Sequence, residues 1–109
     1  MSRAKGDIAE NKAVDFLCDN GYIIVDRNVY SRFGELDIIA LKEDVLHFVE
    51  VKSGEDYEKA IQNITPSKLS KLIKTAYVYM KKEHYTGDYT FDAVVVIPDA
   101  IEFVPNITL

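Results

Sequence analysis

The chain has 109 residues, of which 48% are hydrophobic and 28% are charged, a balance typical of one folded domain spanning residues 1–109. No apolar run reaches the ~18–20 residues that span a bilayer, and the charged N-terminal segment is unlike a signal peptide. We therefore expect a soluble cytoplasmic protein with no membrane partner. One cysteine excludes an internal disulfide, and the net charge of −5 argues against nucleic-acid binding through overall positive charge.

Apolar side chains recur at helical spacing over residues 6–20, which predicts a first helix that stops at Asn20-Gly21. Strands are expected to follow over residues 22–25, 36–41 and 45–52. The turn signal Lys42-Glu43-Asp44 favours a hairpin between the last two of these strands. Residues 27–34, in contrast, are expected to form a loop or an irregular edge.

Residues 53–65 are polar, and we expect them to be partly mobile. A second helix is predicted to begin at Pro66, with Thr65 as its cap, and to end near Lys82. Strands are then predicted over residues 91–97 and 101–104. The order α-β-β-β-α-β-β favours an α/β fold in which helices flank a central mixed β-sheet.

Three charged residues interrupt the apolar strands of the predicted hairpin. Asp37 lies within residues 36–41, and Glu50 and Lys52 lie within residues 45–52. Because side chains alternate along a strand, Glu50 and Lys52 project from the same face of the sheet.

The length of the turn decides whether Asp37 joins that face. An even turn such as Glu43-Asp44 places Leu41 opposite Leu46, and Asp37 therefore opposite Glu50. Directly opposed residues share a face, so the charged side chains would then converge. An odd turn would send Asp37 to the other face.

Two adjacent carboxylates near an apolar surface repel each other, and a divalent cation removes that conflict. Mg²⁺ prefers oxygen ligands, often one or two carboxylates together with phosphate and water. Lys52 would stabilise negative charge on an attacking hydroxide or on a phosphoryl oxygen. Asp37, Glu50 and Lys52 thus form a minimal set for metal-dependent phosphodiester hydrolysis. The alternative is that these charged residues form a solvated ladder on the surface, which contributes little to stability. An Asp followed later by Glu-x-Lys, taken alone, favours that alternative.

Two further glutamates could extend this set. Glu10 lies at the edge of the apolar face of the first predicted helix, from which it could reach the carboxylates as another metal ligand. Glu35 shares strand parity with Asp37. The simpler alternative is that Glu10 is an ordinary boundary residue and that Glu35 is solvated.

Two blocks of the sequence are distinctive, namely Gly34-Glu35-Leu36-Asp37-Ile38-Ile39-Ala40 and Phe48-Val49-Glu50-Val51-Lys52. Weaker matches extend the pattern over nearly the whole chain: Gly6, Ala9-Glu10, Ala13, Phe16-Leu17, Gly21-Tyr22, Ile24, Arg27-Asn28, Lys68, Ala76 and Phe91-Asp92-Ala93-Val94. Together these positions resemble the YraN-like family of small bacterial proteins.

The resemblance implies a restriction-endonuclease-like fold, similar to that of archaeal Holliday-junction resolvases. By this likeness Asp37, Glu50 and Lys52 match metal and catalytic positions, and Glu10 matches a glutamate of the N-terminal helix. The likeness further implies Mg²⁺ or Mn²⁺ as the cofactor, branched DNA as the substrate and a homodimer as the assembly.

The second predicted helix carries a basic face. Its lysines fall within an arc of about 140° at ~100° per residue, opposite an apolar arc. They are Lys68, Lys71, Lys74, Lys81 and Lys82. Such a face fits a phosphate backbone, although a solvated amphipathic helix is the commoner explanation. Nearby tyrosines could stack on unpaired bases, although packing is the commoner role for them: Tyr77, Tyr79 and Tyr85.

Two functional hypotheses follow. The first is a Mg²⁺-dependent, structure-selective DNA endonuclease in which Asp37, Glu50 and Glu10 hold the metal, Lys52 acts on the nucleophilic water, and Lys68, Lys71 and Lys74 bind DNA. The second is a non-catalytic nucleic-acid-binding or protein-interaction module on the same scaffold, which needs no metal site.

Overall fold

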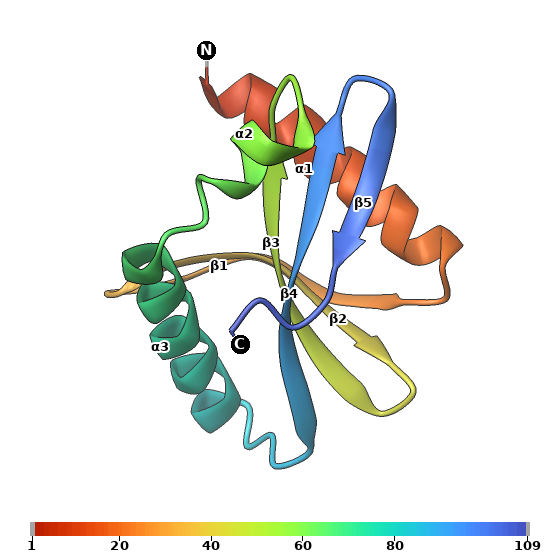
Figure 1. Ribbon diagram of the computed structural model, residues 1–109. Helices are drawn as coiled ribbons and strands as arrows, with labels where there is room; N and C mark the ends of the chain where they lie inside the picture. Colours follow the sequence, from red (N-terminus) through yellow and green to blue (C-terminus); the bar gives the residue numbers. More distant parts are fainter. Residues whose placement is uncertain (1, 109) are drawn as a thin grey trace.

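The computed structural model describes residues 2–108, with the side chains described from Asp7 onward. Figure 1 shows a central twisted sheet with a long helix on each side of it. The elements in chain order are α1 Ser2–Asp19, β1 Ile23–Ser31, β2 Gly34–Lys42, β3 Val45–Ser53, α2 Tyr57–Ile61, α3 Pro66–Lys82, β4 Asp88–Ile97 and β5 Ala100–Val104.

The sheet has five strands in the order β1-β2-β3-β4-β5. Neighbouring strands are antiparallel except for β3 and β4, which are parallel. A parallel pair needs a long crossover connection, and the segment containing α2 and α3 supplies it between β3 and β4. The predicted α/β fold with a central mixed sheet flanked by helices is confirmed.

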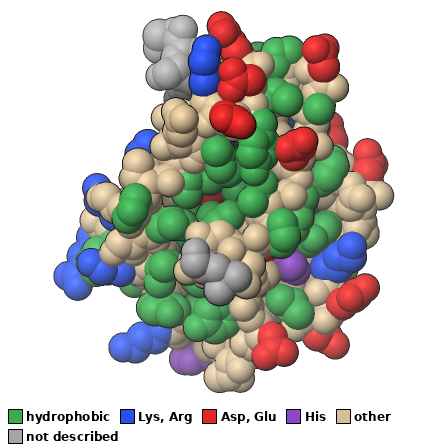
Figure 2. Space-filling view, viewed as in Figure 1, with side chains coloured by type: hydrophobic (Ala, Val, Ile, Leu, Met, Phe, Trp, Pro, Cys, Tyr) green, Lys and Arg blue, Asp and Glu red, His purple; other side chains and the backbone are tan. Residues whose placement is uncertain are grey.

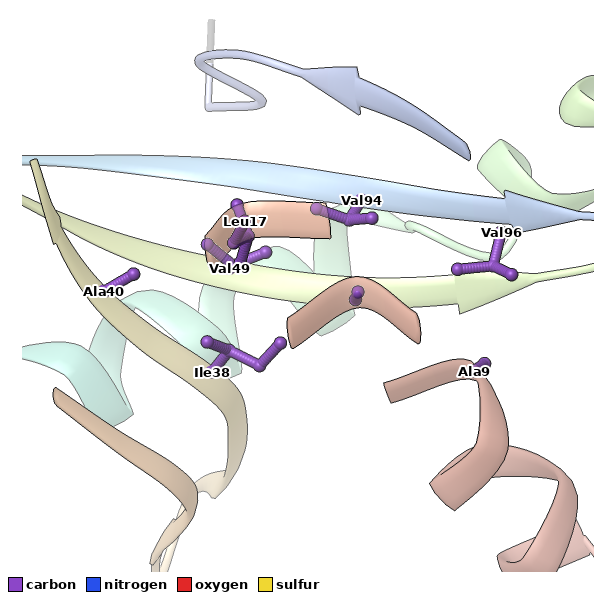
Figure 3. Packing of buried hydrophobic residues seen from close by; sticks show 8 residues of the cluster. Ala9, Leu17, Ile38, Ala40, Val49, Val94 and Val96 are labelled. Carbon is purple, nitrogen blue, oxygen red and sulfur yellow. The ribbon is translucent and has the colours of Figure 1, made fainter. Parts of the chain in front are cut away.

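Helix α1 packs on one face of the sheet through small and apolar side chains at helical spacing. Ala9, Ala13 and Leu17 are buried there. The strand residues of the same cluster are Ile38, Ala40, Val49, Val94 and Val96, and Figure 3 shows how they lie between α1 and strands β2, β3 and β4. The helix ends as predicted at Asn20-Gly21, where Gly21 adopts a φ of 88° that favours glycine.

Helix α3 covers the other face of the sheet. It begins at Pro66, and the Thr65 hydroxyl accepts a hydrogen bond from the Lys68 N–H at 3.2 Å, which confirms the predicted cap. Its apolar stripe packs against residues of β2, β3 and β4 in a second cluster: Leu72, Ala76 and Met80 with Leu36, Ile39, Leu46, Phe48 and Phe91. The two faces of the hairpin β2–β3 are therefore covered by different helices.

Two segments differ from the sequence-based expectation. Residues 27–31, expected to form a loop or an irregular edge, continue the edge strand β1 as far as Ser31, because this polar segment pairs along β2, with Val29 opposite Leu36. A register shift between Ile24 and Asp26 interrupts the pairing. Within residues 53–65, the Asp56 side chain caps the short helix α2. Among the described residues, no helix is long and apolar enough to cross a membrane.

Candidate metal centre

The turn between β2 and β3 sets the register of the candidate site. Glu43 and Asp44 both adopt positive φ, 52° and 64°, as in the two-residue turns that match the twist of a hairpin. Leu41 consequently pairs with Leu46, as the even turn predicts. The paired ladder ends at Ile38 and Val49.

Asp37 lies directly beyond the end of this ladder. Its Oδ2 accepts a hydrogen bond from the Val51 backbone N–H at 2.8 Å, so the carboxylate binds a main-chain donor of the neighbouring strand. This contact holds the Asp37 side chain against the segment of β3 that carries Glu50. The two carboxyl groups predicted to share a face are therefore brought together.

The electrostatic environment of Asp37 is unfavourable for a negative charge. Burial, followed by the Glu50 carboxylate, raises the pKa of Asp37 from 3.8 to about 8, and the Val51 N–H only partly opposes this rise. Glu35 adds a smaller contribution in the same direction. The pair thus resists carrying two negative charges unless a cation is present.

Lys52 lies beside the carboxylate pair. Its Nζ is 3.3 Å from Glu50 Oε2, and the side chains of Lys52 and Glu50 are only 20% and 16% exposed. An ion pair this sheltered is less screened by solvent than one on an open surface ladder. The Asp37, Glu50 and Lys52 side chains accordingly form one cluster.

This cluster lines a pocket of about 340 Å³ between the sheet and α3. The helix contributes Lys68 and Lys71 to the pocket wall, and Glu35 lies at its β2 side. The remaining lining residues are Gly34, Val51 and Leu72. Two of the three lysines predicted to bind DNA therefore lie at the same pocket as the candidate metal ligands.

The tip of the β1–β2 hairpin contacts α3 next to this pocket. The Ser31 and Thr75 hydroxyl oxygens are 2.8 Å apart, within hydrogen-bond distance. Lys74, the third predicted DNA-binding lysine, places its Nζ 5.5 Å from the centre of the Phe33 ring, and the Arg32 guanidinium carbon lies 4.8 Å from the same ring. The pattern of residues 27–34, which favours a loop or an irregular edge, gives no indication of this contact with α3.

Glu10 is not placed at the pocket. Asp37 and Glu50 line the pocket together with residues of α3, whereas Glu10 belongs to α1 and is not among the lining residues. Its Oε1 accepts hydrogen bonds from Arg27 Nε at 3.1 Å and Arg27 Nη2 at 3.0 Å, and from Asn28 Nδ2 at 3.0 Å.

The Glu10 side chain is 8% exposed, and its charge is compensated by Arg27. Over residues 2–108, no group of three or more His, Cys, Asp or Glu side chains could hold a metal ion. A metal ligand role for Glu10 stays a prediction.

A second buried carboxylate, Asp92, was not predicted from the sequence. Its Oδ2 lies 2.6 Å from His47 Nδ1, and its Oδ1 accepts a hydrogen bond from the Asn106 N–H at 2.9 Å. His47 precedes Glu50 by three positions on β3, so the two side chains project from opposite faces of the strand. Asp92 is the one charged residue within the otherwise apolar segment 91–97, which is the signal that could have revealed it.

Charge is distributed unevenly over the surface. In the view of Figure 2, lysine and arginine side chains gather on the side of α3 and of the β1–β2 hairpin tip, whereas acidic side chains concentrate toward the top and right of the molecule. The basic side is the one that carries Lys68, Lys71 and Lys74 on α3. The net charge of −5 therefore conceals a local basic region.

A sequence model of the uncharacterised protein family UPF0102 matches residues 9–96. The chain belongs to this family. It is 64% identical over 109 residues to a UPF0102 protein of Sulfurimonas denitrificans and 54% identical over 109 residues to one of Wolinella succinogenes, each over the full length of both chains. A UPF0102 protein of Helicobacter pylori is 50% identical over 106 residues, covering 97% of this chain and 92% of the relative. The YraN-like resemblance is confirmed at the level of family membership.

Proposed function

We propose that the chain is a Mg²⁺- or Mn²⁺-dependent DNA endonuclease. The observation that carries this proposal is the pocket in which Asp37, Glu50 and Lys52 meet Lys68 and Lys71 of α3. Carboxylates that bind a metal ion, a sheltered ammonium group and flanking lysines are suited to hydrolysis of a phosphodiester.

The donor set fits a hard divalent cation. Asp37 and Glu50 offer carboxylate oxygens. Burial and the nearby Glu50 carboxylate together raise the pKa of Asp37 to about 8, and a bound cation would relieve the repulsion between the two carboxylates. Two carboxylates suffice for Mg²⁺, which usually keeps several waters and binds substrate phosphate. A bound metal would supply Lewis-acid charge and lower the pKa of a water molecule.

Each basic residue of the pocket has a role that follows from its position. Lys52 is held by Glu50 at 3.3 Å, so its ammonium group stays inside the pocket and stabilises negative charge that develops on a phosphoryl oxygen or on the attacking water. Lys68 and Lys71 are exposed at the pocket rim on α3, where they bind the phosphates that flank the reacting one.

The likeness of the sequence to Holliday-junction resolvases supports branched DNA as the substrate and a homodimer as the assembly. The second candidate is a non-catalytic nucleic-acid-binding or protein-interaction module. The position of Glu10, which is bound by Arg27 instead of joining Asp37, favours that candidate.

Cleavage of branched, nicked and single-stranded DNA in Mg²⁺, in Mn²⁺ and in EDTA tests the proposal. We expect metal-dependent cutting that Lys52→Ala abolishes while the fold is retained. Lys59→Ala is the matched control, because Lys59 is 68% exposed and its ion pair with Glu55 lies in the solvent. Cutting in EDTA, or full activity of Lys52→Ala, would contradict the mechanism.

A further inference from the structure

A second groove runs along the outer side of α3, away from the Asp37 pocket. It has a volume of about 470 Å³, and its floor is formed by Leu69, Ile73 and Tyr77, which recur every four residues and so form one stripe of the helix. Thr108 of the C-terminal segment also contributes to its lining. Lys74 is the only charged side chain among the described residues that line it.

An aromatic platform lies at one end of this groove. The ring of Tyr77, 51% exposed, meets that of Tyr89, 42% exposed, edge to face with 6.3 Å between centroids. Tyr89 in turn packs edge to face on Phe91, with 5.9 Å between centroids, and Phe91 is buried in the core. The core therefore supports two rings whose surfaces remain open to solvent.

The other tyrosines of this region are engaged in packing. Tyr79 packs edge to face on the buried Phe48, with 6.2 Å between centroids. The Tyr85 hydroxyl donates a hydrogen bond to the Asp88 carbonyl oxygen at 2.5 Å. Of the three tyrosines that the sequence suggests for base stacking, Tyr77 is the one whose ring is exposed.

The lysines of α3 connect the groove to the Asp37 pocket. Lys71 lines the pocket, and Lys74 both lines the groove and approaches Phe33 of the hairpin tip. Tyr77 follows Lys71 by six residues, about 9 Å along the helix axis at 1.5 Å per residue. This separation corresponds to at most a few nucleotides, because successive phosphates are already about 3.4 Å apart along the axis in a stacked duplex strand.

We propose that this groove binds unpaired bases of a DNA strand whose backbone is held at the Asp37 pocket. Bases stack on exposed aromatic rings without regard to sequence, and the lysines between the two sites match the phosphates of the connecting backbone. A base-paired strand cannot present the faces of its bases in this way. The substrate class is therefore DNA with a single-stranded stretch beside the cleaved bond, an inference that rests on the proposed function.

Binding in EDTA tests this inference without requiring catalysis. Fluorescence anisotropy compares a labelled single-stranded oligonucleotide with a duplex of the same sequence, for the wild type, Tyr77→Leu, Tyr77→Phe and Val78→Ala. We expect the wild type to prefer the single strand and Tyr77→Leu to weaken that binding about tenfold, with duplex binding unchanged. Tyr77→Phe keeps the ring, and Val78→Ala shortens an exposed neighbour outside the groove, so both should bind like the wild type.

Equal single-strand affinity of Tyr77→Leu and the wild type would overturn the inference. It would also be overturned if sedimentation showed a dimer that Tyr77→Leu dissociates without any change in DNA binding, because the groove would then join two copies of the chain. Loss of cleavage alone would count against the proposed function and leave the base-binding result standing. Absence of all DNA binding would overturn both.

Discussion

Asp37, one residue before the first position of β2 that pairs with β3, accepts a hydrogen bond at 2.8 Å from the backbone N–H of Val51, two residues after the last position of β3 that pairs with β2. A side-chain hydrogen bond thus joins the two strands beyond the last pair of main-chain hydrogen-bonded residues. The bond fixes the Asp37 carboxylate beside Glu50, and burial together with the closeness of Glu50 raises the pKa of Asp37 to about 8. The same contact that completes the hairpin therefore assembles the candidate metal centre.

The contribution of Asp37 to stability without metal should fall as the pH rises from about 4 to about 8. In this window the folded protein keeps a proton on Asp37, whose pKa is raised to about 8, while the unfolded chain has lost it. The free energy of unfolding then decreases with pH, by at most about 1.4 kcal/mol per pH unit for this one group. Asp37→Asn should remove that part of the slope.

Urea unfolding of the wild type and Asp37→Asn in EDTA at pH 5.5 and pH 8 measures this difference. An identical pH dependence in both proteins would show that Asp37 titrates in its ordinary range. Mn²⁺ binding should show the opposite trend and strengthen toward pH 8, because the carboxylate must lose its proton before it can bind metal.

Lysines at the pocket should matter more for DNA binding than lysines elsewhere on α3. Lys68→Gln/Lys71→Gln should weaken binding and reduce the slope of log affinity against log salt by about 2, since two phosphate contacts are lost. Lys81→Gln/Lys82→Gln is the control, because it removes the same charge at the far end of the helix. The triple change Lys68→Glu/Lys71→Glu/Lys74→Glu should eliminate binding in a gel shift. Equal losses in the two glutamine variants would indicate a diffuse charge effect.

Glu10→Gln should lower the free energy of unfolding by about 1–3 kcal/mol, because it weakens a sheltered charge-assisted contact with Arg27. Because Glu10 binds Arg27 and does not line the Asp37 pocket, we expect the decrease in the free energy of unfolding to be the same in EDTA and in Mn²⁺. A loss of the Mn²⁺-induced stabilisation in this variant would instead assign Glu10 to the metal site, as the family resemblance implies. Chemical denaturation under both conditions separates the two roles.

The turn residues made the hairpin predictable. Glu43 and Asp44 form a two-residue turn, and strand alternation then placed Asp37 with Glu50 and Lys52. The cap at Thr65 and the stop at Gly21 were equally local signals, readable from a few residues. Features of this kind depend on short-range chemistry, so the sequence alone indicates them.

The remaining features depend on contacts between distant segments. The polar residues 27–31 form a strand because β2 lies beside them, and nothing in their own pattern indicates that partner. Helical spacing placed Glu10 at a boundary but could not tell which face of the sheet lay next to it. Arg27, 17 positions away in the sequence, binds it instead.

The most direct test of the central claim is a thermal melt at pH 7.5, with EDTA and with Mn²⁺, of the wild type, Asp37→Asn and Glu50→Gln. A cation that binds only the folded protein stabilises it by about 2.7 kcal/mol at 100 times its Kd. Glu55→Gln, at a side chain that is 89% exposed, is the control and should keep the full Mn²⁺ shift.

We expect Mn²⁺ to raise the Tm of the wild type and both site variants to lose most of that rise. In EDTA, Asp37→Asn should be at least as stable as the wild type, because the amide avoids both repulsion with Glu50 and the uptake of a proton that otherwise relieves it. Glu50→Gln also deprives Lys52 of its partner, so no such gain is expected there. Equal Mn²⁺ shifts in the wild type and both site variants would contradict a metal centre shared by Asp37 and Glu50.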